Sequence, residues 1–160
     1  MKNAVLLILS VLIVFSVEAR QRKHKKKVKS GNKIETITMQ RTACYGRCPT
    51  YIIELNKNGS VIYTAYRNTA DSGVFEKNIG EKRADEIFNQ AVTTKIDTCR
   101  NEYIMRVTDL PGLIFTIKYA DSTKIINNAN FGPAVLRELS ETLDGITGKK
   151  VDETWHRKVN

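Results

Sequence analysis

The stretch Tyr51–Tyr66 reads YIIELNKNGSVIYTAY, and it decides the fold. Two runs rich in β-branched and aromatic residues, Tyr51–Leu55 and Val61–Tyr66, are joined through Asn-Lys-Asn-Gly at positions 56–59. An Asn-Gly pair between such runs is the strongest short-range signal of a β-hairpin. The stretch therefore predicts two neighbouring antiparallel strands near the middle of the chain.

Residues on both sides of this hairpin continue the strand pattern. Ile34–Thr42 alternates weakly before it, and Val74–Ile79 follows it. Later in the chain one strand face is formed by Leu113, Phe115, Ile117 and Tyr119. Ala120–Thr123 is typical of a turn, after which Lys124–Asn127 pairs back.

Two segments instead repeat their apolar residues with the period of a helix. The first segment has Glu81 in its first turn and an apolar stripe made of Ala84, Ile87, Phe88, Ala91 and Val92. The second begins at Gly132-Pro133, ends at Gly145 and has the stripe Val135, Leu136, Leu139 and Leu143. Asp97–Asp109, between the first helix and the later strands, is expected to be irregular.

The order of elements is thus three or four strands, a helix, two strands and a helix. Each helix has a single apolar stripe and must bury it against a sheet, which the hairpin connections make mainly antiparallel. We expect an α+β fold, a two-layer sandwich with two helices on one face of the sheet. It would occupy residues 34–160 as a single domain.

The first residues indicate export. Met1–Ala19 has a short start with Lys2, the apolar run Ala4–Val17 and a small residue at position 19, as in a secretory signal peptide cleaved after Ala19. An apolar run of this length is short of the ~20 residues that span a bilayer. The prediction is a periplasmic or extracellular protein without a transmembrane helix in its mature form. An uncleaved anchor is the alternative, because basic residues follow the run.

Arg20–Lys33 is a basic segment without acids, predicted to be a disordered linker. It holds eight of the 26 Lys and Arg residues, so the +9 net charge of the chain belongs mostly to this segment. The nearly neutral remainder excludes a basic nucleic-acid-binding domain. The segment is expected to contact an anionic surface or to act as a solvated spacer.

Between the first strand and the hairpin stands Cys44-Tyr45-Gly46-Arg47-Cys48-Pro49-Thr50-Tyr51. With Asn58-Gly59 and Asp109-Leu110-Pro111, this motif resembles a family of exported bacterial domains, common in the Bacteroidetes group and classed as a domain of unknown function. The resemblance covers Ile34–Ile146. It implies a bacterial, extracytoplasmic setting and supplies no activity.

Export to an oxidising compartment favours a disulfide, and we predict that Cys44 and Cys48 form it while Cys99 stays unpaired. Bridges from Cys99 would close longer loops and so stabilise more on the chain-entropy model. The local bridge needs a chain reversal, for which Gly46 permits a positive φ and Pro49 stops any helix.

The sequence C-x-x-x-C-P also resembles the copper site of assembly factors that deliver copper to respiratory oxidases. Two thiolates and an imidazole suit copper, but the only histidines are His24 and His156, at unrelated spacings. A redox dithiol would require an activating cation such as Arg47. Copper or redox handling is therefore the alternative function, and no metal or cofactor is predicted.

Catalytic motifs such as G-x-S-x-G or H-E-x-x-H do not occur in the sequence. Asp109 and Asp121 flank a strand, which leaves a paired-acid site or two turn formers as interpretations. Five aromatic residues form either a binding face or core pairs: Tyr63, Tyr66, Phe75, Tyr103 and Tyr119. Trp155 is expected to pack the C-terminal segment against the domain.

The function that these patterns favour is a non-catalytic exported domain that binds an unknown envelope or extracellular ligand through loops near Cys44–Cys48. The candidate binding residues are Gly46, Arg47, Pro49, Tyr51, Tyr63 and Asp109.

Overall fold

The computed structural model describes residues 33–104, 109–128, 131–147 and 151–158. In chain order the elements are β1 (Ile34–Arg41), β2 (Thr50–Asn56), β3 (Ser60–Arg67), β4 (Gly73–Asn78), α2 (Glu81–Thr93), η3 (Ile96–Thr98), β5 (Glu102–Tyr103), β6 (Leu113–Tyr119), β7 (Thr123–Asn128), α3 (Ala134–Thr147) and β8 (His156–Arg157). The expected signal peptide and nearly all of the basic linker lie outside the described residues. Within them, no helix has the length and apolarity needed to cross a membrane.

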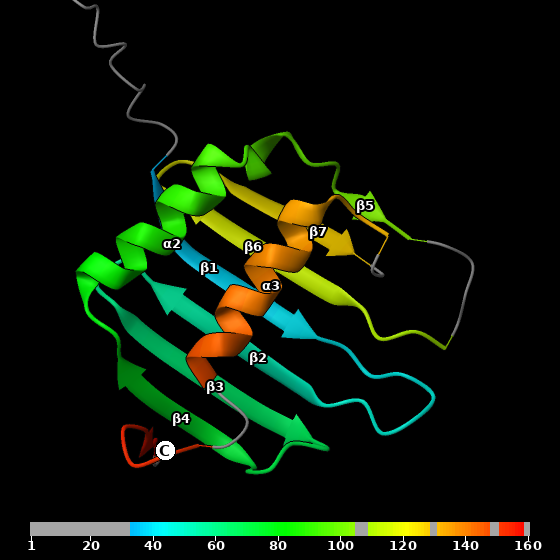
Figure 1. Cartoon of the computed structure of the whole chain (residues 1–160), viewed down its shortest axis with the longest axis vertical. Helices are drawn as coiled ribbons and strands as arrows, with labels where there is room; N and C mark the ends of the chain where they lie inside the picture. Colours follow the sequence, from blue (N-terminus) through cyan, green and yellow to red (C-terminus); the bar gives the residue numbers. More distant parts are fainter. Residues whose placement is uncertain (1–32, 105–108, 129–130, 148–150, 159–160) are drawn as a thin grey trace, which may run out of the picture.

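The described strands form one eight-stranded sheet in the order β5-β7-β6-β1-β2-β3-β4-β8 (Figure 1). All neighbouring pairs are antiparallel except β5 and β7. β1 lies inside the sheet because it pairs with β2 on one side and β6 on the other. The predicted central hairpin is present as β2 and β3, in which Leu55 pairs with Val61.

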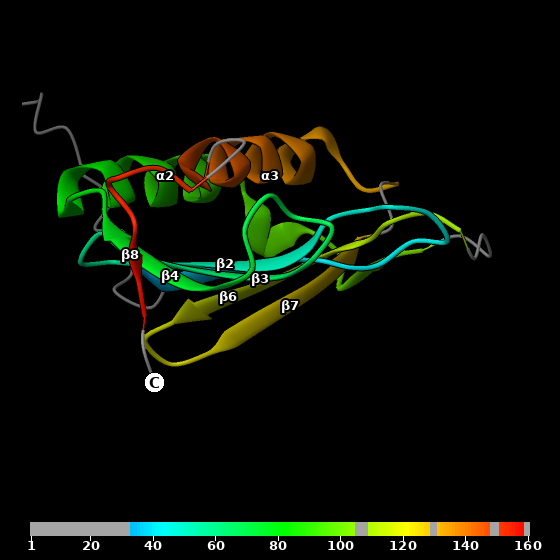
Figure 2. The ribbon, with the colours of Figure 1, turned by 90° about the horizontal axis from the view of Figure 1, so that it is seen from below.

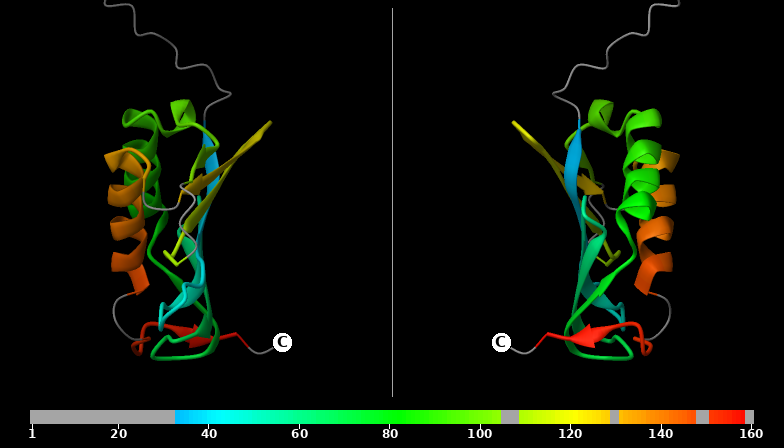
Figure 3. Two further views of the ribbon diagram at one scale, coloured as in Figure 1. Left: turned by 90° about the vertical axis from the view of Figure 1, so that its right-hand side faces the viewer. Right: turned by 90° about the vertical axis from the view of Figure 1, so that its left-hand side faces the viewer.

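Both helices lie on one face of the sheet, as Figures 2 and 3 show from the side. Each presents its apolar stripe to the core, with Ala84, Ile87, Phe88 and Ala91 buried in α2 and Leu136, Leu139 and Leu143 buried in α3. The strands contribute the residues that alternate toward this face, among them the fully buried Ile37, Ile53 and Phe115. The α+β two-layer sandwich expected from the sequence is confirmed.

The turn between β2 and β3 depends on Gly59. Its φ of +83° is in the left-handed region, and a Cβ there would lie 2.4 Å from the backbone carbon of Gly80. The Gly59 N–H donates to the Asn56 carbonyl at 2.9 Å, and the Ile79 N–H donates to the Gly59 carbonyl at the same distance. Only glycine satisfies both the conformation and this close approach.

The C-terminal segment packs against the outer part of the sheet, which confirms the expectation for Trp155. Its side chain is 6% exposed, and its ring centroid lies 5.9 Å from that of Tyr63. The Lys77 ammonium lies 4.4 Å from the Trp155 ring centroid. Immediately after Trp155, β8 pairs with the strand β4.

Four details differ from the sequence-based expectations. α3 continues through Gly145 to Thr147, because a helix tolerates an exposed glycine near its end at modest cost. Val92 is 38% exposed, since it stands at the margin of the α2 stripe. The stretch expected to be irregular contains η3 and β5, and the C-terminus adds β8. These elements are two or three residues long, too short to produce a periodic pattern.

Candidate functional site

The connection between β1 and β2 is closed by a disulfide between Cys44 and Cys48, with an S–S distance of 1.99 Å and a Cα–Cα distance of 5.7 Å. Cys99 is a free, buried thiol, as expected. We call residues 44–48 the disulfide loop. Tyr45 near its tip is 91% exposed, the largest value among the exposed large hydrophobic residues of the described chain. Arg47 and Pro49 are exposed as well.

Gly46 does not use the positive φ that glycine permits; the positive-φ glycines of the described residues are Gly59, Gly73 and Gly80. The disulfide loop reverses without a left-handed glycine. The Gly46 N–H instead donates to Cys44 Sγ at 3.2 Å. A Cβ added at Gly46 would lie 3.8 Å from that sulfur, its nearest neighbour, so a side chain fits there.

The disulfide loop is attached to its surroundings on both sides. Asn68, in the left-handed conformation with a φ of 55°, donates from Nδ2 to the Cys48 carbonyl at 3.2 Å. On the other side, the Gly112 N–H donates to Thr42 Oγ1 at 2.8 Å, and the Thr42 N–H donates to the Gly112 carbonyl at 3.0 Å. These bonds hold the loop to the β3–β4 connection and to the start of β6.

Beneath the loop, Arg41, Tyr51 and Asp144 form what we call the loop-base cluster. Arg41 ends β1 and pairs with Tyr51 of β2 in the sheet register. The Arg41 guanidinium forms an ion pair with the Asp144 carboxylate of α3. Tyr51 donates its phenolic proton to Asp144 Oδ1 at 2.5 Å. The cluster therefore ties the two strands that flank the loop to one helix.

The cluster also fixes the protonation of its members. Burial raises the pKa of Tyr51, and the hydrogen bond to Asp144 raises it further. Burial alone would lower the pKa of Arg41, but its hydrogen bond and charge interaction with Asp144 outweigh this and raise it. The phenol stays protonated and the guanidinium stays charged at neutral pH, so both act as donors rather than as acid–base catalysts.

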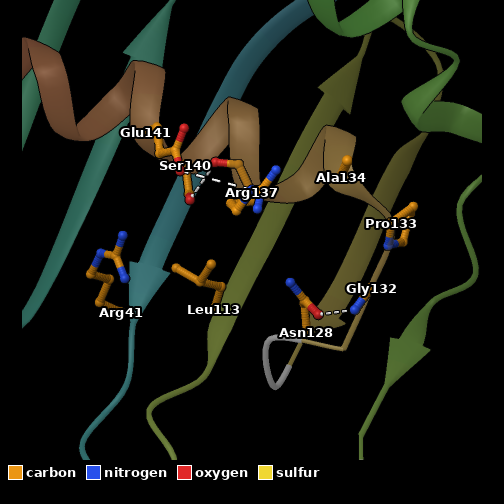
Figure 4. A pocket seen from close by; sticks show the side chains of 9 residues that line it. All are labelled: Arg41, Leu113, Asn128, Gly132, Pro133, Ala134, Arg137, Ser140 and Glu141. Carbon is orange, nitrogen blue, oxygen red and sulfur yellow. Dashed lines mark hydrogen bonds and ion pairs between the residues drawn. The ribbon is translucent and has the colours of Figure 1, made fainter.

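A cavity of about 400 Å³ opens beside Arg41, and we call it the α3 cavity. It lies between the first half of α3 and the ends of β1, β6 and β7 (Figure 4). Its lining is Arg41, Leu113, Asn128, Gly132, Pro133, Ala134, Arg137, Ser140 and Glu141. The cavity and the disulfide loop belong to the same end of the sheet, because Arg41 precedes the loop by three residues.

The remaining candidate residues are placed less favourably for binding. The Tyr63 ring is 8% exposed and contacts the Tyr51 ring at 5.5 Å and the Phe75 ring at 6.3 Å, so these aromatics are core pairs. Asp109 is exposed at the beginning of the connection to β6. Asp121 follows the opposite end of that strand, about 20 Å away along a strand of this length. This separation favours the interpretation of both acids as turn residues.

The described residues contain no group of three or more His, Cys, Asp and Glu side chains able to hold a metal ion. His156 lies in β8 at the far side of β4, and β3 and β4 separate it from β2 and the loop. Each of the two loop sulfurs bonds to the other. A copper site would therefore require reduction of the loop and a third ligand from elsewhere.

The sequence matches the model of one protein family. A family model matches residues 35–147, and its description is "Domain of unknown function (DUF6438)". The chain belongs to this family. The matched region runs from β1 to the end of α3 and so includes the disulfide loop, the loop-base cluster and the α3 cavity. No curated protein matches the chain.

Sequence reasoning found the loop but missed Arg41, Asn128, Arg137 and Asp144. Asp144 stands 103 residues from Arg41, and only the packing of α3 on the sheet brings them together. One signal was present in the sequence, because the Tyr that ends the C-x-G-x-C-P-x-Y motif belongs to the strand after the loop. A tyrosine directed into a core needs a partner for its hydroxyl group.

Proposed function

We propose that the protein is a non-catalytic, exported domain of the bacterial cell envelope, and that it binds its ligand with the disulfide loop. The exposure of Tyr45 on a covalently closed loop carries this proposal. An aromatic ring offers a large contact area at little cost in side-chain entropy. A loop that is closed and hydrogen-bonded before binding loses little further freedom when a ligand docks.

The surroundings of Tyr45 support the same function. Arg47 is exposed next to it and adds a charged, multidentate donor at the loop tip. The basic segment Arg20–Lys33 supplies a second, purely electrostatic contribution that would attract the domain to anionic envelope polymers. Loops on a rigid sheet are where binding residues concentrate.

The proposal is tested by sedimenting the purified exported protein with peptidoglycan sacculi, and separately with envelope vesicles, from the producing bacterium. We expect retention at physiological salt, and Tyr45→Ala should weaken it at least about tenfold, which is 1.4 kcal/mol. Ile125→Ala is the matched control, because Ile125 is a 54% exposed apolar side chain on β7, away from the loop. Equal retention of Tyr45→Ala and wild type on both preparations would overturn the proposal.

Copper or redox handling by Cys44 and Cys48 is the alternative, and the same loop separates the two functions. Ligand binding by a preorganised loop requires the intact bridge, whereas metal or redox chemistry requires free thiols. Stoichiometric copper in the reduced protein, lost in Cys48→Ser, together with no retention on envelope preparations, would establish the alternative. Retention that is weakened by reduction supports envelope binding.

A further inference from the structure

We propose that the α3 cavity binds a small organic anion through a carboxylate or phosphate group. The inference goes beyond the proposed function, because a soluble anion can occupy this cavity whether or not Tyr45 binds the envelope. It rests on three sets of hydrogen-bond donors that converge on one space, and on the size of that space.

The first donor is the side-chain amide of Asn128, which is 4% exposed at the end of β7. Its Oδ1 accepts the Gly132 N–H at 2.9 Å. Because a backbone N–H can only donate, this bond fixes the oxygen toward Gly132 and the NH₂ group away from it. Figure 4 shows that nitrogen directed into the cavity, between Leu113 and α3. A buried NH₂ group at the wall of a cavity is a donor for an oxyanion.

The second set consists of two guanidinium groups. Arg41 uses Nε and Nη2 for Asp144, whose charge holds it at the cavity wall. Within the described part of the chain, the Arg137 side chain pairs with Glu141 at 3.9 Å, and both of these side chains are about 70% exposed. An exposed pair of this kind contributes little, so Arg137 can exchange Glu141 for a bound anion at small cost. Arg matches the paired oxygens of carboxylate and phosphate groups.

The third set is the backbone at the start of α3. The first turn of this helix carries no acidic residue, whereas the first turn of α2 has Glu81. The first N–H groups of a helix lack intrahelical acceptors and lie at the positive end of its dipole. Pro133 and Ala134 place this end in the cavity wall. The donors that Asn128 and the arginines provide therefore line the same space as the first residues of this helix.

The volume indicates what kind of anion fits. About 400 Å³ is within the range of ligand sites and exceeds the space that one inorganic ion needs. Leu113 and Pro133 add apolar surface to the wall, which suits the carbon skeleton of an organic ligand. Glu141 is the one carboxylate in the described lining, and it disfavours a ligand with negative charge on that side.

The experiment titrates the mature chain with inorganic phosphate and, separately, with citrate, each against sodium chloride of equal ionic strength. Binding is followed by calorimetry and by the amide signals of Asn128 and Ala134 in NMR spectra. We expect saturable binding of at least one probe, with a Kd on the order of 1 mM for a fragment of the natural ligand. Binding of phosphate alone or citrate alone supports the site and identifies the anionic group.

Asn128→Asp tests the buried donor, because it keeps an oxygen for the Gly132 N–H and replaces the NH₂ group by a second, charged oxygen. We expect binding to weaken at least about tenfold. Asn127→Asp adds the same charge one residue earlier, on the exposed side of β7, and should leave binding within about twofold.

Arg137→Gln keeps the test decisive if Asn128→Asp does not fold, because Arg137 is exposed. Its matched control is Arg83→Gln in α2, where Arg83 also stands in the first turn of a helix and pairs with Glu86 at 2.9 Å. We expect Arg137→Gln to abolish the rise in Tm that the binding probe produces, and Arg83→Gln to retain it.

Absence of saturable binding for both probes, or equal weakening by Arg137→Gln and Arg83→Gln, would overturn the anion site. Neither outcome affects retention on sacculi or vesicles through Tyr45. The failure of this inference and the failure of the proposed function are therefore distinguishable.

Discussion

The two ends of β2 connect it to neighbouring antiparallel strands in opposite ways. At its C-terminal end, a tight turn leads to β3 and depends on Gly59, whose backbone lies against Gly80. At its N-terminal end, the disulfide loop leads back to β1, and no left-handed glycine is needed because a covalent bond closes it. One connection is specified by backbone geometry and the other by cysteine chemistry.

The difference has a functional consequence. In the turn, the residue that the geometry requires is Gly59, which is buried and has no side chain to offer a ligand. A loop that a disulfide closes can leave Tyr45 and Arg47 in solvent without losing its shape. Because the disulfide closes this connection, the residues exposed at its tip can vary without loss of its stability.

The largest expected effect on stability comes from a substitution in the turn between β2 and β3. Gly59→Ala forces a Cβ into a backbone contact of 2.4 Å and into a positive φ, so it should lower the free energy of unfolding by about 3 kcal/mol. Gly46→Ala is the matched control in the disulfide loop, where the nearest atom is 3.8 Å away, and should cost less than about 0.5 kcal/mol. Urea unfolding measures both. Similar losses for the two variants would contradict the comparison.

The next largest effect on stability is expected when the disulfide loop is opened. Replacing Cys44 and Cys48 together by serine should lower the free energy of unfolding by about 2 kcal/mol, the value the chain-entropy model gives for a five-residue loop. The strands should still pair, because the loop-base cluster and the Thr42–Gly112 bonds remain. Urea unfolding with and without reductant checks this: reductant should destabilise the wild type and leave the double variant unchanged.

A smaller effect concerns the cluster beneath the loop. Tyr51→Phe removes a hydrogen bond to the Asp144 carboxylate and should cost about 1.5 kcal/mol at neutral pH. Because folding raises the pKa of Tyr51, its contribution is fully present below the unfolded pKa of about 10 and is lost as the pH rises through the folded pKa.

Unfolding of Tyr51→Phe and wild type at a series of pH values from about 7 to about 11, which brackets the unfolded pKa, is the measurement. The difference between them should be constant up to about pH 10 and shrink above it. Tyr66→Phe is the control, since Tyr66 is 53% exposed on β3. A difference that stays constant through the alkaline range would disprove the role assigned to the phenol.

The parts of the fold that the sequence predicts are those formed by residues close together in the chain. The hairpin around Asn58-Gly59 and the stripes of both helices are local patterns, and they predict the two layers and the pairing of β2 with β3. The bridge between Cys44 and Cys48 is also local. β5 and β8 are not predictable in this way, because two-residue strands exist only where tertiary packing brings a partner to them.

The candidate site likewise has one part that is continuous in sequence and other parts that join distant residues. The disulfide loop is continuous in sequence and could be found from its motif. The loop-base cluster joins residues 93 and 103 positions apart, and the α3 cavity collects residues from β1, β6, β7 and α3. No pattern in one sequence places such residues together, because the docking of α3 on the sheet determines their contacts.

The smallest effect on stability is expected for changes in the basic segment Arg20–Lys33, which the sequence predicts as a second binding region. Replacing its eight Lys and Arg residues by serine, at constant length, should leave the free energy of unfolding unchanged within about 0.5 kcal/mol, because the segment precedes the sheet.

Retention of this serine variant on envelope vesicles should fall in low salt and differ little from wild type in high salt, since a Debye length of about 10 Å at 0.1 M screens exposed charges. Tyr45→Ala should show the opposite pattern, with a loss that persists in high salt because it removes contact area rather than charge. Constant length separates attraction from spacing: if the serine variant is retained as well as wild type at every salt concentration, the segment acts only as a spacer, and binding belongs to the disulfide loop alone.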